Sequence, residues 1–87
     1  MCTMIAEKVT VSGSAKGPDG WFRVAQAYIG YDHPVHADEE HALSLDFVNE
    51  EFGPSARVAI ELDRHTARAL VQRIQAALDA ADSYEDG

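Results

Sequence analysis

The sequence has little cysteine, few basic residues and no long apolar run, and each shortage excludes a class of protein. Its one cysteine, Cys2, cannot form an internal disulfide, which is typical of a reducing compartment. Only 7 basic residues stand against 15 acidic ones, and the formal net charge of -8 disfavours binding to a phosphate backbone. No stretch approaches the roughly 18 apolar residues of a membrane span, and residues 1–10 lack the basic and apolar regions of a signal peptide. We therefore expect a cytoplasmic protein with no nucleic-acid partner and no membrane partner.

The remaining composition is that of an ordinary folded protein. Apolar residues make up 46% of the 87 residues and charged residues 25%, unlike the polar, highly charged composition of disordered chains. A chain of this length forms one domain and buries only about 60% of the surface that its unfolded form exposes. A partner subunit or a bound ion would therefore contribute stability.

Four segments have the alternation or the β-branched and aromatic content of strands. The clearest is residues 41–49, in which Leu43, Leu45 and Phe47 share one face. Residues 13–20 contain three glycines and a proline and predict a hairpin turn. The predicted strands are residues 4–12, 21–31, 41–49 and 57–62.

A single amphipathic helix is predicted after the last strand. Asp63 occupies the position of a helix N-cap, and residues 64–81 contain neither glycine nor proline. The helix carries an apolar stripe at helical spacing: Ala67, Leu70, Val71, Ile74, Ala77, Leu78 and Ala81. Residues 1–82 are thus expected to form a single α+β domain, and residues 83–87 an acidic, frayed tail.

The order of these segments predicts an α+β fold: a four-stranded antiparallel β-meander with one C-terminal amphipathic helix packed on one face (ββββα). The helix is expected to cover the sheet face that carries Leu43 and Leu45. The opposite face mixes polar and apolar residues, which predicts a homodimer contact in which Arg57 pairs with Asp46 or Glu61.

The predicted meander also brings distant residues together, because each strand begins beside the end of the strand before it. His41 should then lie opposite Asp32 and His33, and Cys2 beside Tyr31. The end of the fourth strand should bring His65 to the same edge. The only cysteine and all four histidines are therefore expected at one pole of the sheet.

Thiolate and imidazole groups suit zinc or another transition metal, so the predicted metal ligands are Cys2, His33, His36 and His41. Three ligands with an open position would allow catalysis on a small molecule, whereas four would make a structural site. The HxxH spacing is not an established zinc motif. Further residues at the same pole are candidates for the second shell or for substrate binding: Tyr31, Asp32 and His65.

Other interpretations remain open for the same residues. His33 and His36 are also explained as turn residues and His41 as the start of a sheet edge, with Cys2 a small buried apolar side chain or simply exposed. Without a metal, the chain would be an accessory module that binds a small-molecule ligand or a partner protein. A third hypothesis is a cofactor-independent enzyme that uses a Cys2–His pair, because a neighbouring imidazolium lowers the pKa of a thiol.

The predicted hairpin turn offers a weaker candidate at the other pole. Lys16 lies in a glycine- and serine-rich stretch whose backbone N–H groups could hold a phosphate or carboxylate. The stretch lacks the Walker spacing and no helix follows it, which favours a plain hairpin. The neighbouring Trp21 is expected to anchor the core.

The segments MCTMI, GSAKGPDGWF, YDHPVHA, DFVN and GPSARVAIEL, together with His41, resemble a family of small, functionally uncharacterised actinobacterial proteins. The resemblance extends from Met1 to about Leu78. It implies a compact stand-alone domain but brings no established activity, so it assigns no catalytic residue.

Overall fold

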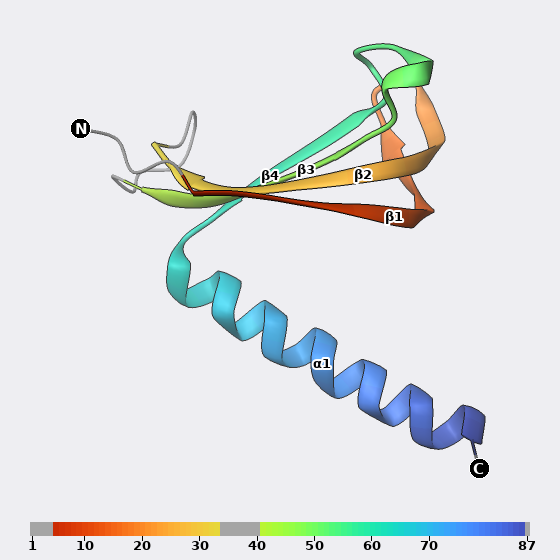
Figure 1. The fold of residues 1–87 in the computed structure, drawn as a ribbon, viewed down its shortest axis with the longest axis vertical. Helices are drawn as coiled ribbons and strands as arrows, with labels where there is room; N and C mark the ends of the chain where they lie inside the picture. The colour runs from red at the N-terminus through yellow and green to blue at the C-terminus, as the bar shows by residue number, and fades with distance from the viewer. Residues whose placement is uncertain (1–4, 34–40, 87) are drawn as a thin grey trace.

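The computed structural model describes residues 5–33 and 41–86. They form one antiparallel sheet with strand order β1-β2-β3-β4, followed by a single helix (Figure 1). This confirms the predicted ββββα class. The elements are β1 (Ile5–Gly17), β2 (Gly20–Asp32), β3 (Ala42–Val48), the 3-10 turn η1 (Glu50–Phe52), β4 (Arg57–Leu62) and α1 (Arg64–Asp86).

The first hairpin is longer than the sequence predicted. β1 continues to Gly17, and only residues 18–19 form the turn before β2. Gly20 has a φ of 113°, a conformation that glycine adopts without strain. A register shift between Thr10 and Gly13 marks a bulge, and bulges bend the strand that carries them. The glycine-rich residues 13–17 therefore form the end of a bent strand and not a loop.

Asn49 joins the hairpin to the connection between β3 and β4. Its side chain is buried, with 4% exposed, and its Nδ2 donates a hydrogen bond to the Arg23 carbonyl of β2 at 2.9 Å. Its Oδ1 accepts from the Glu51 N–H at 3.1 Å and caps η1. The backbone N–H of Asn49 donates to the Ala56 carbonyl at 3.1 Å. One amide side chain thus organises the end of the sheet that carries η1.

The two sheet faces differ strongly in polarity. Pairing sets Ile29 opposite Leu45, and Leu45 opposite Ile60, so that apolar side chains lie in rows across the strands. We call this surface the apolar face. It consists of Ile5, Val9, Ala27, Ile29, Tyr31, Leu43, Leu45, Phe47, Val58, Ile60 and Leu62, with Glu7 at its β1 edge.

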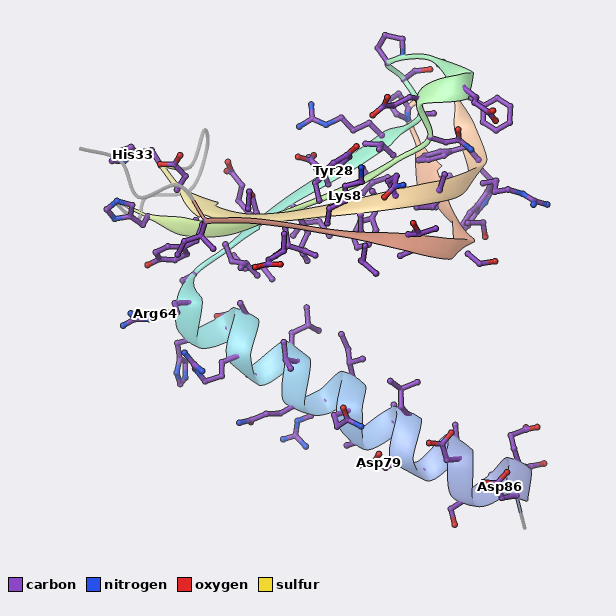
Figure 2. All side chains as sticks on the ribbon, viewed as in Figure 1. Lys8, Tyr28, His33, Arg64, Asp79 and Asp86 are labelled. Atoms are coloured by element: carbon purple, nitrogen blue, oxygen red, sulfur yellow. The ribbon has the colours of Figure 1, made fainter. Side chains whose placement is uncertain are left out.

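Several polar groups of the opposite face are paired within the chain. Arg57 Nη2 lies 2.8 Å from Asp46 Oδ1, which is the pairing expected from the sequence, formed between β4 and β3. The Lys8 ammonium lies 5.8 Å from the centre of the Tyr28 ring. The Tyr28 hydroxyl donates a hydrogen bond to Glu50 Oε1 at 3.2 Å. Burial of the hydroxyl raises the pKa of Tyr28, and the negative charge of Glu50 raises it further. Figure 2 shows Lys8 and Tyr28 together on β1 and β2.

The helix does not cover the apolar face as expected. Ala67 in its first turns is 7% exposed, but Ile74 is 50% and Leu78 53% exposed. Figure 1 shows α1 leaving the sheet at the end of β4 and diverging from it. Only Asp63 separates β4 from α1, so the chain lacks a connection long enough to fold the helix back over the strands.

The helix also extends beyond its predicted end. Residues 83–86, expected to be a frayed tail, belong to α1. The helix has the length of a membrane span but not the required hydropathy, so no described helix could span a membrane.

Candidate functional site at the histidine pole

Antiparallel pairing brings two histidines together at the end of β2. Asp32 pairs with Ala42, so His33 after β2 lies beside His41 before β3. Their imidazole rings stack with centroids 4.8 Å apart and planes inclined by 25°. The predicted proximity of His33 and His41 is therefore confirmed. We call the end of the sheet that carries this stack the histidine pole.

Tyr31 and Asp32 hold this pair in place. The Tyr31 ring stacks on His41 with a centroid distance of 5.7 Å and an angle of 19°. Asp32 Oδ1 accepts the backbone N–H of His33 at 2.8 Å, which orients the chain as it leaves β2. His41 thus stacks with two rings, and these contacts restrict its imidazole more than an exposed turn would.

A pocket of about 570 Å³ opens beside His41. It lies where the end of the sheet meets the first turns of α1, and His65 contributes to it, as the topology predicted. Figure 2 shows His33 and Arg64 at the same end of the molecule. The lining residues are Tyr31, His41, Asp63, Arg64, His65 and Arg68.

Arg64 and Arg68 were not predicted from the sequence as residues of this site. They are four positions apart in the first turns of α1, so they project from the same side of the helix. Like His65, they directly follow the end of β4, and the strand topology places that end at the histidine pole. Within residues 5–33 and 41–86, neither guanidinium has a carboxylate in salt-bridge contact.

Asp63 lines the pocket but is engaged in capping the helix. Its Oδ1 accepts the Thr66 N–H at 2.7 Å, and its Oδ2 accepts the Thr66 hydroxyl at 2.9 Å. The backbone hydrogen bond from Thr66, followed by the hydroxyl hydrogen bond, lowers the pKa of Asp63. The N-cap predicted from the sequence is confirmed, and it leaves the two arginines as the cationic groups of the pocket.

The structure brings together two of the four predicted metal ligands. His33 and His41 form the stack, whereas Cys2 and His36 lie outside the described residues. Among the residues that are described, no three histidine, cysteine, aspartate or glutamate side chains form a group able to hold a metal.

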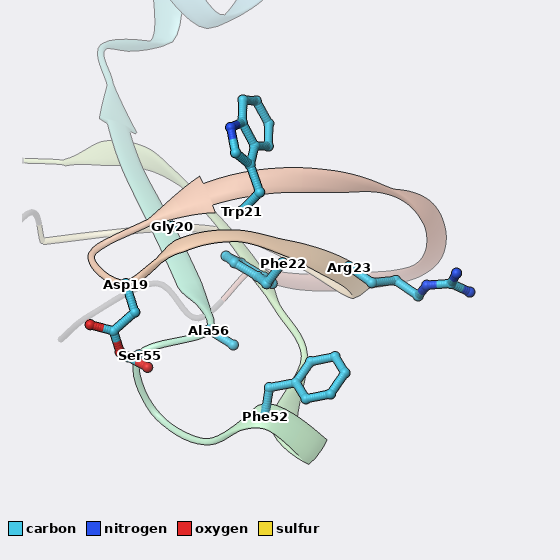
Figure 3. Close-up of a pocket in the computed structure, with 8 residues that line it drawn as sticks. All are labelled: Asp19, Gly20, Trp21, Phe22, Arg23, Phe52, Ser55 and Ala56. Atoms are coloured by element: carbon cyan, nitrogen blue, oxygen red, sulfur yellow. The ribbon is translucent and has the colours of Figure 1, made fainter.

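The opposite pole differs from its prediction. Trp21 is 71% exposed and does not anchor the core, because α1 diverges before it could cover this end of the sheet. Lys16 pairs with Trp21 within the β1–β2 ladder, so it lies in a strand and not in the turn that the sequence predicted. A shallow pocket of about 440 Å³ lies here, and Trp21 points away from its Phe22 and Phe52 (Figure 3).

One antiparallel sheet followed by one helix places the chain in the α+β class. The chain belongs to DUF6295, a family of unknown function whose model matches residues 1–86. No match was found among curated proteins or among solved structures.

Proposed function

We propose that this protein binds a transition-metal ion, most simply zinc, and that His33 and His41 are two of its ligands. The stacked imidazoles carry the proposal. Two imidazoles on one tetrahedral ion have ring centres roughly 5 Å apart when each Zn–N bond is about 2 Å long. The observed separation of 4.8 Å is close to that spacing, so reorienting the two side chains out of their stack would aim one nitrogen of each ring at a shared ion.

The other two ligands in the proposal are Cys2 and His36. β1 begins at Ile5 opposite Tyr31, so the chain enters the sheet at the histidine pole, which supports Cys2 as a donor. Tyr31, Asp32 and His65 serve in the second shell or contact a substrate. If only three side chains bind the ion, its open position activates water or a small molecule, and the protein is a metal-dependent enzyme.

Elemental analysis of the purified chain tests this proposal after dialysis against a weak chelator. The parent should retain about one ion per chain. His33→Ala and His41→Ala should lose it, whereas Arg68→Ala, a change at the same pole, should keep it. A parent protein without metal, or full metal content in both variants, would contradict the proposal.

Cobalt substitution then tests the thiolate separately. Cobalt bound by sulfur shows an intense thiolate-to-metal absorption, which should be present in the parent and missing from Cys2→Ser. His36→Ala should lower the affinity for cobalt while preserving that absorption. An identical spectrum in Cys2→Ser would remove Cys2 from the ligand set.

A second candidate is a metal-free accessory module that binds a small anionic ligand. It is favoured by Arg64 and Arg68 in the 570 Å³ pocket, since guanidinium groups bind carboxylates and phosphates in a bidentate manner. Calorimetry with inorganic phosphate and with citrate on metal-free protein tests it. The double variant Arg64→Ala/Arg68→Ala should abolish binding, whereas Arg73→Ala on the same helix should not. If the double variant and Arg73→Ala bind phosphate and citrate equally well, this pocket is not the anion-binding site.

The third candidate is a cofactor-independent enzyme that uses a Cys2–His pair. It requires rapid alkylation of Cys2 by iodoacetamide at neutral pH, slowed by His41→Ala. Unchanged alkylation in that variant would exclude His41 as the partner.

Two further parts of the proposal rest on the sequence. The lone cysteine supports a cytoplasmic location, and the MCTMI, GSAKGPDGWF and YDHPVHA segments support an actinobacterial source. The proposal also keeps Lys16, at the opposite pole, as an anion-binding side chain.

A further inference from the structure

The single chain is far less compact than a monomer of its mass. It exposes 6896 Å², whereas a compact monomer of 9.5 kDa exposes roughly 5,000 Å². Its radius of gyration is 14.9 Å, against about 12 Å for a compact chain of 87 residues. About 1,900 Å² of surface per chain is thus exposed in excess.

Apolar groups dominate the surface between sheet and helix. Along α1, Leu70 is 42% and Val71 62% exposed, and Ile60 on the apolar face is 38% exposed. Figure 2 shows side chains without nitrogen or oxygen along the side of α1 that faces the sheet. The buried apolar residues within the described part are small or medium-sized: Val24, Ala27, Ala42, Ala56 and Ala67. Two apolar surfaces, the apolar face of the sheet and the apolar stripe of α1, therefore face each other. We call the space between them the wedge.

We propose that a second copy of this chain fills the wedge, with the α1 helix of each chain inserted between the sheet and the α1 helix of the other. A two-fold arrangement buries both apolar surfaces of both chains in one closed interface. Obligate homodimers bury about 1,000–2,500 Å² per chain. The excess of about 1,900 Å² lies within that range.

The charge along α1 determines how the two helices run. Its first half carries Arg64, Arg68 and Arg73, and its last turns carry Asp79, Asp82, Glu85 and Asp86. Antiparallel packing sets the basic half of one helix against the acidic half of the other, whereas parallel packing would set like charges together. The apolar stripe from Ala67 to Ala81 is symmetric about Ile74, so the two-fold axis passes near Ile74.

The proposed contact lies on the apolar side of the sheet and not on its polar face. The polar face was expected to pack against a second copy, but Arg57 and Asp46 already pair within the chain and Arg57 stays 57% exposed. Apolar surface, which drives association, lies on the other side of the sheet.

Sedimentation equilibrium on the full chain tests the proposal. The parent should be a dimer, and its unfolding midpoint should rise with chain concentration. Ile74→Asp should weaken association by more than about tenfold, because it buries a charge in an apolar interface. Gln72→Asp, which places the same side chain on the opposite side of α1, should leave the dimer intact.

A charge exchange tests the antiparallel arrangement without touching the apolar stripe. Arg68→Glu should weaken the dimer, and Arg68→Glu/Asp82→Arg should restore it. These positions are about 21 Å apart along one helix at 1.5 Å per residue, so only the partner chain can provide the rescue. Failure of the rescue would overturn the antiparallel packing. A parent that stays monomeric and unfolds at a concentration-independent midpoint would overturn the dimer, and none of these results depends on bound metal.

Discussion

The imidazole of His33 stacks on that of His41, with ring centroids 4.8 Å apart, across the connection between β2 and β3. Neither residue belongs to a strand, yet the pairing of Asp32 with Ala42 positions both. The candidate site is therefore a product of strand register. A one-residue slip would turn the neighbouring side chains to the other face and separate the pair.

Removal of the proposed metal ion should destabilise the protein. A ligand that binds only the folded state raises the unfolding midpoint, so a strong chelator should lower the midpoint of the parent in differential scanning calorimetry. His41→Ala should unfold at the same temperature with and without chelator, whereas Arg68→Ala, at the same pole, should respond as the parent does. A parent midpoint that is insensitive to chelator would argue against a bound ion.

Asn49→Ala should cost about 1–3 kcal/mol in the free energy of unfolding, because it leaves the Arg23 carbonyl and the Glu51 N–H without their partner. Gln75→Ala is the control. Its side chain also donates one hydrogen bond, to Asp79 at 2.9 Å, but on the exposed surface of α1. That change should cost less than about 0.5 kcal/mol. Urea denaturation compares the two, and equal costs would contradict a structural role for Asn49.

Gly17→Ala should destabilise the fold by roughly 1–3 kcal/mol through overpacking. An added Cβ would lie 3.0 Å from the Ser55 carbonyl oxygen and 3.2 Å from the Phe22 ring. Gly13→Ala in the same strand meets nothing within 4 Å and should be neutral or stabilising by up to about 1 kcal/mol. If both variants unfold at the same urea concentration, the hairpin does not approach Ser55 as closely as described.

The stability that Asp63 contributes should depend on pH. Because its pKa is lower in the folded state than the ordinary 3.8, its contribution is complete above that value and is lost as the pH falls through the folded pKa. Asp63→Asn keeps an oxygen for the Thr66 N–H but carries no charge. An acid titration followed by far-ultraviolet circular dichroism should show less loss of helix in the variant than in the parent over this range. Identical titrations would exclude the carboxylate charge as a source of acid sensitivity.

Arg57→Ala should cost less than about 1 kcal/mol, because its ion pair with Asp46 is more than half exposed on the arginine side. Arg57→Glu should leave self-association unchanged, since the proposed interface is the apolar face and α1. Light scattering at several concentrations measures this. If the Arg57→Glu variant dissociates, the dimer contact lies on the polar face of the sheet instead.

The local elements follow from short-range physics. The alternation of Leu43, Leu45 and Phe47 predicted β3, and Asp63 predicted the start of α1, because the periods of strands and helices and the need to cap a helix act over a few residues. The meander then predicted the meeting of His33 with His41, since short connections permit few alternative topologies.

The relation between helix and sheet needed the tertiary structure. The apolar stripe predicted that α1 buries one side, but not that the single residue between β4 and α1 directs the helix away from its own sheet. The same divergence leaves Trp21 exposed. The sequence by itself determined the four strands, the capped helix and the histidine pole, because each depends on local periodicity and on neighbouring strands. Only the tertiary structure decided which surfaces stay uncovered, because that depends on the direction in which α1 leaves β4.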